Sequence, residues 1–423
     1  MRRLIGRVFE SQGFRSAGLM TIGNISSTGL SAVAMIIFSR LLGPSDFGVF
    51  SVLFSLLLIL SKLGDFGVNI AVQREIALNK SNSKLLVKMT QTGAYIKLII
   101  SLILALTGIF FSKWLSQNVL KVESSEMVMV VFILSSAVIF YEYINTILQA
   151  KGLFIWSVLS NFTQAIGKLL AAVLLSLYTL ITVDLVVGLY LFMPLIGGMT
   201  GFFALPARLF TPKFDPASFK KIVGIAKWTS IAIVSATLAD NLDVIIVQNY
   251  LSSYDTGLWS AAVRIASVAS LVGWSLGTVL NVRVAAYKDQ HNLDQYLKKA
   301  VFVSISSALL ISVVAFFSNF AIKYTVGIEF LPAVTPLFLL LLSTALLTAT
   351  SPFIALFYLF DKPAYFAISG LISSAILIFS DILLVPSLGV TGAGYARLIT
   401  RLGVLLFTLY YARRGYLERY AKS

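Results

Sequence analysis

Residues Pro332–Phe357 read PAVTPLFLLLLSTALLTATSPFIALF, a continuous apolar run without a charged side chain. A helix of about 20 such residues crosses the hydrocarbon core of a bilayer, which is ~30 Å thick. The rest of the chain has the same character, because 58% of its 423 residues are hydrophobic, only 12% are charged, and the mean hydropathy is +0.90. A soluble domain carries about 25% charged residues. The sequence therefore predicts an all-α polytopic membrane protein.

Twelve runs of about this length follow one another along the chain. They are continuously apolar rather than alternating, which favours helices over a membrane β-barrel. The twelve predicted transmembrane helices are Ala17–Leu42, Phe47–Val72, Gly93–Ser112, Met127–Leu148, Leu153–Tyr178, Val183–Leu205, Trp228–Leu251, Gly257–Val282, Ala300–Ile322, Pro332–Phe357, Ala364–Val385 and Val390–Ala412.

The distribution of basic residues predicts the orientation of these helices. Most of the 33 lysines and arginines lie in the two tails and the even-numbered connections, whereas the odd-numbered connections hold Arg40, Lys113, Lys121 and Lys323. Because cytoplasmic loops are enriched in basic residues, both termini are expected in the cytoplasm. The net charge of +15 is thus explained by basic residues in the cytoplasmic connections and tails. No polar stretch is long enough to form a nucleic-acid-binding module.

The chain divides into two similar halves. The polar connection Pro206–Lys227 separates six spans from six, which predicts domains at 1–205 and 228–423 joined by a linker at 206–227. A shift of 209 residues aligns Leu42–Ala77 with Leu251–Ala286, and eight of these 36 pairs are identical, including Gly48/Gly257. Chance would give about two or three. We therefore expect two six-helix bundles related by a pseudo-two-fold axis along the membrane normal, with a cavity between them.

Signatures of enzymes, metal sites and cofactor sites are absent from the sequence. The chain has no cysteine and one histidine, which excludes thiolate chemistry and histidine metal sites. Gly167-Lys168 is followed by Leu169 and lacks the first glycine of a P-loop, so ATP hydrolysis by this chain is not expected. We predict no catalytic residues, no metal, no cofactor and no enzymatic activity.

Charged residues within the predicted spans are the most informative feature for function. Each costs about 2.5–3.5 kcal/mol at the centre of a membrane helix, so these residues should face the bundle interior or a water-filled cavity. Ten of them are singled out here, five basic and five acidic: Lys62, Lys168, Arg264, Arg397 and Arg401, and Asp65, Glu142, Asp240, Asp243 and Asp381.

Some of these charges are expected to neutralise one another. Lys62 and Asp65 lie three residues apart on one helical face, so they form either a local ion pair or part of a cavity. Asp243 and Arg264 lie at similar depths, roughly 15 Å into the seventh and eighth spans, which makes a pair across that hairpin easy. Asp240 has no cation at equal depth on the adjacent span, which makes it a candidate for proton exchange.

The remaining cations predict a basic interior. Arg397 and Arg401 share one face of the last span, and Asp381 reaches the depth of Arg397, which leaves Arg401 without an obvious partner. Lys168 is also mismatched, because Glu142 on the preceding span lies nearer the cytoplasm. Such a surplus suits an anionic substrate such as a phosphate or pyrophosphate, which arginine binds as a fork; purely structural pairing is the alternative.

Four phrases resemble a known family of transporters. FSRLLGPSDFGVFSVLFSLL (38–57), KLGDFGVNIAVQRE (62–75), DNLDVIIVQNYLSSYDTGLWSAAVRI (240–265) and VPSLGVTGAGYARLITRLG (385–403) are similar to stretches of the Wzx-type oligosaccharide flippases. These proteins form the polysaccharide transporter branch of the multidrug/oligosaccharidyl-lipid/polysaccharide exporter superfamily. The six-plus-six arrangement extends the resemblance over essentially the whole chain.

The resemblance implies a flippase of the bacterial plasma membrane. Such a protein moves an undecaprenyl-pyrophosphate-linked oligosaccharide to the outer leaflet by alternating access, coupled to an ion gradient, for O-antigen, capsule or exopolysaccharide synthesis. A polysaccharide polymerase would then be a partner, besides the anionic lipid-linked glycan and the lipid bilayer. On this analogy the predicted substrate-binding residues are Arg264, Arg401, Arg397, Lys168, Arg40 and Lys62, and the predicted ion-coupling residues are Asp240, Asp243, Glu142 and Asp381.

Three other functions compete with this interpretation. A cation-coupled multidrug antiporter of the same superfamily would favour a cavity of acids and aromatics, whereas the spans here carry as many basic as acidic groups. A glycan polymerase would need a long outer loop with catalytic groups, and the outer connections are short. A scaffolding membrane protein would not need unpaired charges in its spans.

Overall fold

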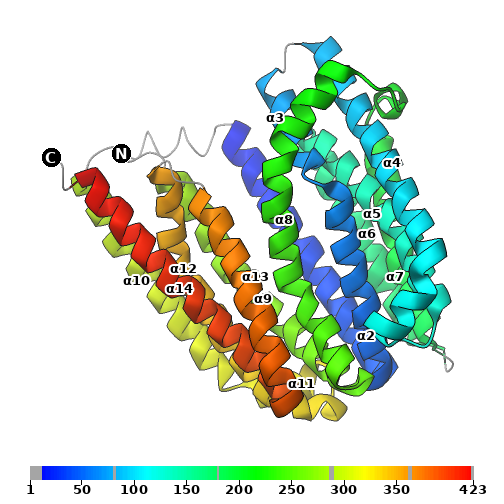
Figure 1. Cartoon of the computed structure of the whole chain (residues 1–423), viewed down its shortest axis with the longest axis vertical. Coiled ribbons are helices and arrows are strands. Elements are labelled where there is room, and N and C mark those ends of the chain that lie inside the picture. Colours follow the sequence, from blue (N-terminus) through cyan, green and yellow to red (C-terminus); the bar gives the residue numbers. More distant parts are fainter. Residues whose placement is uncertain (1–11, 80–81, 179–180, 285–289, 361–363, 421–423) are drawn as a thin grey trace. The chain divides into compact units, whose positions relative to one another are not determined.

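The computed structural model describes residues 12–79, 82–178, 181–284, 290–360 and 364–420, and every regular element within these ranges is helical. Long helices dominate, as Figure 1 shows. In chain order the elements are α2 (Gln12–Asp65), α3 (Val68–Leu78), α4 (Ser83–Leu115), η1 (Ser116–Leu120), α5 (Ser125–Ala150), α6 (Phe154–Leu175), α7 (Val183–Phe202), η2 (Ala207–Phe210), α8 (Pro216–Tyr250), α9 (Ser253–Val284), α10 (Gln290–Ala315), α11 (Ser318–Thr325), η3 (Ile328–Ala333), α12 (Val334–Leu359), α13 (Ala364–Leu388) and α14 (Val390–Tyr420).

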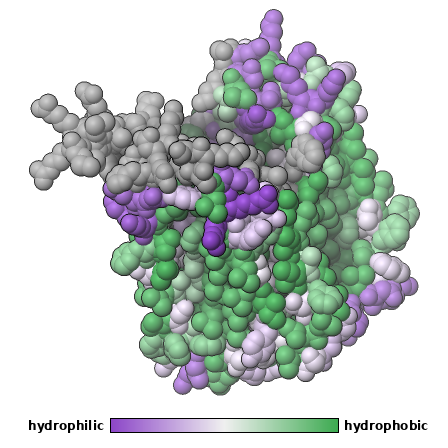
Figure 2. All heavy atoms as spheres, turned by 60° about the vertical axis from the view of Figure 1, so that its left-hand side comes forward, coloured by the Kyte–Doolittle hydropathy of each residue, from purple (hydrophilic) through white to green (hydrophobic). Residues whose placement is uncertain are grey.

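Ten helices among the described residues are long and apolar enough to cross a membrane. The face shown in Figure 2 is broadly hydrophobic, and its hydrophilic residues gather toward the helix ends. The protein is therefore a multi-pass membrane protein with an all-helical fold. The first two predicted spans lie together in α2, and the eighth lies in α9, whose side chains beyond residue 271 fall outside the described part.

A kink at Gly43 separates the two apolar runs of α2. Gly43 has φ 68° and ψ 174°, a left-handed backbone that a residue without a Cβ adopts without strain. Pro44 then starts the second run, because proline fits the first turn of a helix where its missing N–H is not needed. The second run is shorter than predicted, since α2 ends at Asp65 and Phe66 and Gly67, both with positive φ, turn the chain into α3.

The chain forms two compact units. The first contains residues Met1–Leu41 and Leu53–Val234, and the second contains Leu42–Val52 and Ser235–Ser423. One boundary between these units falls within α8, and residues 206–227 include η2 and the first turns of α8, while the linker at 206–227 stays a prediction. The six-helix domains 1–205 and 228–423 stay a prediction.

In the first unit a buried core forms where α3, α4 and α5 meet the start of α8. Val72, Met89 and Tyr143 lie fully or almost fully buried there, together with Leu209 of η2 and Ile222 of α8. The phenol of Tyr143 donates a hydrogen bond to the Thr90 carbonyl at 2.6 Å, which satisfies its polar end within the core. The segment predicted as a linker thus has its own apolar contacts with the first unit.

In the second unit α12 is the central helix. It contacts α9, α10 and α14, and α13 packs along α14. Leu337, Leu340 and Leu341 of α12 are almost completely buried, because the helix is apolar all round and is covered on several sides.

Two glycines that the internal repeat makes equivalent lie against each other's helices in the second unit. A Cβ on Gly48 would overlap the carbonyl oxygen of Ser253, and a Cβ on Gly257 would overlap that of Pro44. Positions 44 and 253, like 48 and 257, differ by 209 residues. The contact is therefore reciprocal, as in an isologous two-fold interface, and no side chain fits at either glycine.

Asp215 fixes the start of α8 outside the membrane-spanning segment. Its Oδ2 accepts hydrogen bonds from the Ser218 hydroxyl at 2.7 Å and the Ser218 N–H at 3.0 Å, and its Oδ1 pairs with Lys88 Nζ at 3.0 Å. The hydrogen bond from the Ser218 side chain and that from Lys88 lower the pKa of Asp215 to about 2. Asp215 therefore acts as the N-terminal cap of α8 and ties it to α4.

An Asp215→Asn variant is expected to be less stable at neutral pH. The pKa of an unfolded aspartate is about 3.9. Because folding depresses this pKa, the stabilisation by the carboxylate is present above pH ~4 and is lost as the pH falls toward about 2. Thermal unfolding in detergent between pH 7 and 2 should show a lower midpoint for the variant at pH 7 and a difference that shrinks below pH ~4. A difference that is constant with pH would contradict this role.

Candidate functional site

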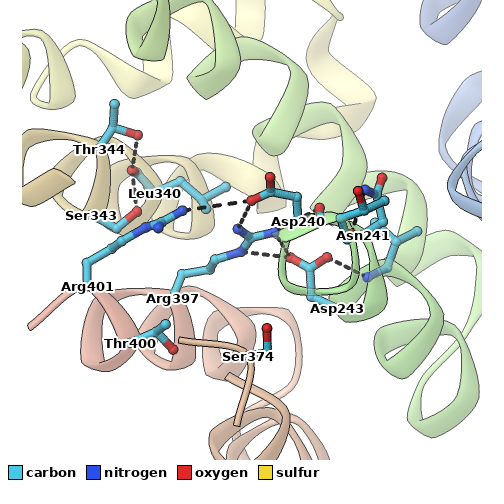
Figure 3. Close-up of polar contacts among 12 residues, drawn as sticks. Asp240, Asn241, Asp243, Leu340, Ser343, Thr344, Ser374, Arg397, Thr400 and Arg401 are labelled. Atoms are coloured by element: carbon cyan, nitrogen blue, oxygen red, sulfur yellow. Dashed lines mark hydrogen bonds and ion pairs between the residues drawn. The ribbon is translucent and has the colours of Figure 1, made fainter. Parts of the chain in front are cut away.

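An arginine–aspartate cluster connects α8 and α14 within the second unit (Figure 3). Arg397 Nε and Nη2 donate to Asp243 Oδ2 at 2.9 and 2.7 Å, and Nη2 also donates to the Asp240 carbonyl at 3.0 Å. Asp243 is fully buried and Arg397 is almost so. The pair is thus desolvated and held by several charge-assisted hydrogen bonds.

Asp240 and Arg401 lie one helical turn from this pair. The Oδ1 atom of Asp240 is 3.5 Å from Arg397 Nη1 and 3.9 Å from Arg401 Nη2. The side chain of Asp240 is 61% exposed and that of Arg401 20%. The Arg401 guanidinium donates no hydrogen bond within the described ranges. Since this group has five N–H donors, most of its binding capacity is available to a ligand.

Asp381 of α13 is the third acid near the cluster. It is fully buried, its electrostatic neighbours are Asp243 and Arg397, and neither of its oxygens has a hydrogen-bond partner among the described residues. Burying a carboxylate without a hydrogen-bonding partner costs free energy, and binding of a proton or a cation at Asp381 would reduce that cost.

Small residues bring the three helices close enough to form the cluster. Ala239 of α8 and Ala396 of α14 pack around Leu377 of α13, and the Ser374 hydroxyl donates to the Ser235 carbonyl at 2.8 Å. Small side chains allow such close approach of membrane helices, and a serine hydroxyl can bond across the interface. The charged residues next to Ala239 and Ala396 are thereby brought within ion-pair distance.

The structure revises the expected pairings in this region. The cation bonded to Asp243 is Arg397 of the last helix, whereas the expected pair with Arg264 of α9 stays a prediction. Asp240, for which the sequence offered no cation at equal depth on the adjacent span, lies within 4 Å of two cations of α14, Arg397 and Arg401. Asp381 does not pair with Arg397 by a hydrogen bond.

Two ion pairs of the first unit involve charged residues that the sequence singled out. Lys62 Nζ is 2.6 Å from Glu142 Oε1, so the local Lys62–Asp65 pair that the spacing allowed gives way to a contact between α2 and α5. Asp65 instead pairs with Lys97 of α4 at 2.5 Å, and both side chains are buried. Sequence reasoning missed Lys97, although it falls inside the predicted span Gly93–Ser112 and the cost of a charge in a span was the available signal.

The remaining predicted site residues are spread over both units. Lys168 of α6 is buried with its Nζ 4.3 Å from the centre of the Tyr190 ring, a cation–π contact. Arg40 is exposed on α2, three residues before the kink. Arg264 is half-buried on α9. A role for any of these residues in binding substrate or ions stays a prediction.

Similar folds occur among membrane transporters. The structure described as the lipid II flippase MurJ in an inward closed conformation has a TM-score of 0.77 and 17% identity, covering 93% of this chain and 87% of that one. Multidrug resistance MATE family transporters of the MOP superfamily are also similar. The inward-facing structure has a TM-score of 0.70 and 14% identity, and the match covers 92% of this chain and 95% of that one. The outward-facing structure has a TM-score of 0.61 and 16% identity, and the match covers 96% of each chain. At these identities the likeness establishes the fold.

The sequence itself identifies the family. None of the curated proteins compared with this sequence matches it. The family model described as polysaccharide biosynthesis protein matches residues 14–281, more than half of the chain and nearly all of the first unit. The chain belongs to the polysaccharide biosynthesis protein family, and its fold is similar to those of the lipid II flippase and the multidrug transporters named above.

Proposed function

We propose that the protein flips an undecaprenyl-pyrophosphate-linked oligosaccharide from the cytoplasmic to the outer leaflet of the bacterial plasma membrane. It does so by alternating access and supplies O-antigen, capsule or exopolysaccharide synthesis. Membership of the polysaccharide biosynthesis family supports the pathway, and the fold shared with a lipid II flippase supports a lipid-linked cargo. A polysaccharide polymerase that uses the flipped glycan is the partner that this role requires.

The proposed topology has twelve spans in two six-helix bundles, with both termini in the cytoplasm. The kink in α2 supports the count, because it separates two runs of membrane-spanning length in one helix. The reciprocal contact of Gly48 and Gly257 supports a pseudo-two-fold relation between the repeated segments.

Arg401 is the residue that we propose binds the pyrophosphate of the substrate. Its side chain is partly exposed, and its guanidinium makes one distant ion pair and donates no hydrogen bond within the described part of the chain. A planar fork of unused donors matches the oxygens of a phosphate or pyrophosphate. Arg397 supports Arg401 indirectly, because its own charge is satisfied by Asp243 and it thereby fixes the position of α14.

Asp381 is the strongest of the proposed ion-coupling residues Asp240, Asp243, Glu142 and Asp381. Asp243 and Glu142 are each bound to a cationic side chain at 2.7 and 2.6 Å, and Asp240 is largely solvated. Asp381 alone among these four is buried without a hydrogen-bond partner in the described residues. Binding and release of a proton or a cation at this carboxylate would therefore change the charge of the cluster.

An Asp381→Asn variant is expected to lose coupling to the ion gradient. In proteoliposomes the wild-type protein should move the lipid-linked glycan faster when a proton or sodium gradient is imposed, and the variant should move it at one rate regardless of the gradient. Glu418→Gln, which removes an exposed carboxylate from the end of α14, is the matched control and should keep the response. A variant at Asp381 that still responds fully would exclude this residue from coupling.

A cation-coupled multidrug antiporter is the second candidate, favoured by the MATE structures with the same fold. The two functions differ in cells that lack the gene. A flippase predicts loss of surface polysaccharide and accumulation of its lipid-linked precursor on the cytoplasmic side, both restored by the gene. An antiporter predicts unchanged polysaccharide and increased sensitivity to cationic drugs, a result that would overturn our proposal.

A further inference from the structure

A row of uncharged polar side chains joins α2, α5 and α6 in the first unit. Asn161 Nδ2 donates to Asn24 Oδ1 at 3.1 Å, and Asn161 Oδ1 accepts from the Tyr141 hydroxyl. The same hydroxyl accepts from Gln164 Nε2 at 2.8 Å. These four residues, Asn24, Tyr141, Asn161 and Gln164, are called the polar row below.

The polar row lies within the apolar part of its helices and on the same side as a buried cation. Asn161 is seven residues beyond Phe154, the start of α6, which places it about 10 Å along the helix. Asn161, Gln164 and Lys168 follow at spacings of three and four residues, so they share one face of α6. The neutral amides of the row thus lie one turn from the buried Lys168 on this face.

Two features of the row are unexplained by helix packing. The Oε1 atom of Gln164 is buried and has no hydrogen-bond partner among the described residues. Asn24 is exposed, as is Thr28 one turn further along the same face of α2. Exposed amides are unfavourable against lipid, so this surface faces either a water-filled space or a bound molecule.

A neighbouring group of polar residues shows what a purely structural network looks like in this unit. Asn145 donates to Ser160 Oγ at 3.3 Å and accepts from Ser157 at 3.0 Å, and Ser160 donates to the Gly197 carbonyl at 2.6 Å. All three are buried, and none of their side-chain atoms lacks a partner. The polar row differs from it in being partly exposed and in leaving an acceptor unused.

The chemistry of the row fits a saccharide. Each sugar hydroxyl both donates and accepts hydrogen bonds, and a side-chain amide offers a donor and an acceptor side by side. The row carries no charge, so it would not bind a phosphate group strongly. We propose that the polar row binds hydroxyl groups of the glycan, separately from the cationic groups that bind the pyrophosphate. This inference rests on the proposed flippase function.

A Gln164→Met variant tests the proposal, since methionine has a similar length but no hydrogen-bonding amide. The two probes are undecaprenyl pyrophosphate carrying its oligosaccharide, extracted from cells that make the protein, and glycan-free undecaprenyl pyrophosphate. In proteoliposomes the variant should move the glycan-bearing lipid about tenfold more slowly than wild type, the effect of one or two lost hydrogen bonds. It should move the glycan-free lipid at the wild-type rate.

Controls separate this effect from misfolding. Thr163→Val changes a neighbouring residue of α6 whose hydroxyl bonds to the Leu159 carbonyl of its own helix at 2.8 Å, and both lipids should move normally. Binding of the free oligosaccharide, measured as a rise in thermal unfolding midpoint, should be detectable for wild type and lost in Gln164→Met. A variant that slows both lipids equally, or neither, would overturn the saccharide site. Failure of the wild-type protein to move either lipid would instead overturn the flippase function and with it the site.

Discussion

Replacing Arg397 with leucine is expected to destabilise the protein by about 3–5 kcal/mol, the usual cost of leaving one member of a buried ion pair without its partner. Asp243 is fully buried, and Arg397 supplies both side-chain hydrogen bonds to its Oδ2. Without Arg397 that carboxylate would have to take up a proton or draw water into the helix interface. Thermal unfolding in detergent and the yield of monodisperse protein measure the loss.

A second substitution should reverse much of this loss. In the double variant Arg397→Leu/Asp243→Leu both charges are gone, and replacing a buried pair by apolar residues is often neutral. Arg414→Leu is the matched control on the same helix, because its pair with Glu418 is exposed and should contribute at most about 1 kcal/mol. If Arg397→Leu unfolded at the wild-type temperature, or if the double variant were no more stable than the single one, the pair would not hold α8 and α14 together.

Replacing Arg401 with glutamine is expected to slow transport of the lipid-linked glycan by about 100-fold. Loss of a charged contact to a partly desolvated phosphate costs about 2–5 kcal/mol, and each 1.4 kcal/mol is a factor of ten. The unfolding temperature should change little, since Arg401 has no hydrogen bond within the described residues and its ion pair is 3.9 Å long. Initial rates in proteoliposomes, compared with unfolding midpoints of the same preparations, separate the two effects.

Arg401→Lys distinguishes a guanidinium fork from simple positive charge. Lysine keeps the charge but offers a single ammonium, so an intermediate rate is expected if the pyrophosphate is bound in a bidentate manner. Wild-type rates in both Arg401 variants would show that this side chain does not contact the substrate.

The membrane class and most helices followed from the sequence because continuous apolar runs leave few alternatives. The internal repeat was also visible in the sequence, but the reciprocal packing of Gly48 and Gly257 against each other's segments was not, and it comes from the structure alone. Helix ends were less predictable. The apolar residues of the predicted span continue past Asp65 to Val72. The positive φ values of Phe66 and Gly67, which end α2, cannot be read from the hydropathy of the sequence.

Charge pairing was the least predictable feature of the candidate site. Depth along a hairpin suggested Arg264 as the partner of Asp243, but the bonded partner Arg397 lies 154 residues away on α14. Its position depends on how α8, α13 and α14 pack around Ala239, Leu377 and Ala396, which no local pattern encodes. The same applies to Lys62, whose partner Glu142 lies 80 residues away rather than one turn along its own helix.

Transbilayer movement of the lipid-pyrophosphate-linked oligosaccharide in proteoliposomes containing the purified protein tests the central claim most directly. The account predicts movement well above that of protein-free vesicles for the wild type, and loss of most of it in a folded Arg401→Gln variant. Movement of a cationic drug with no movement of the glycan, by well-folded wild-type protein, would contradict the flippase and establish the antiporter in its place.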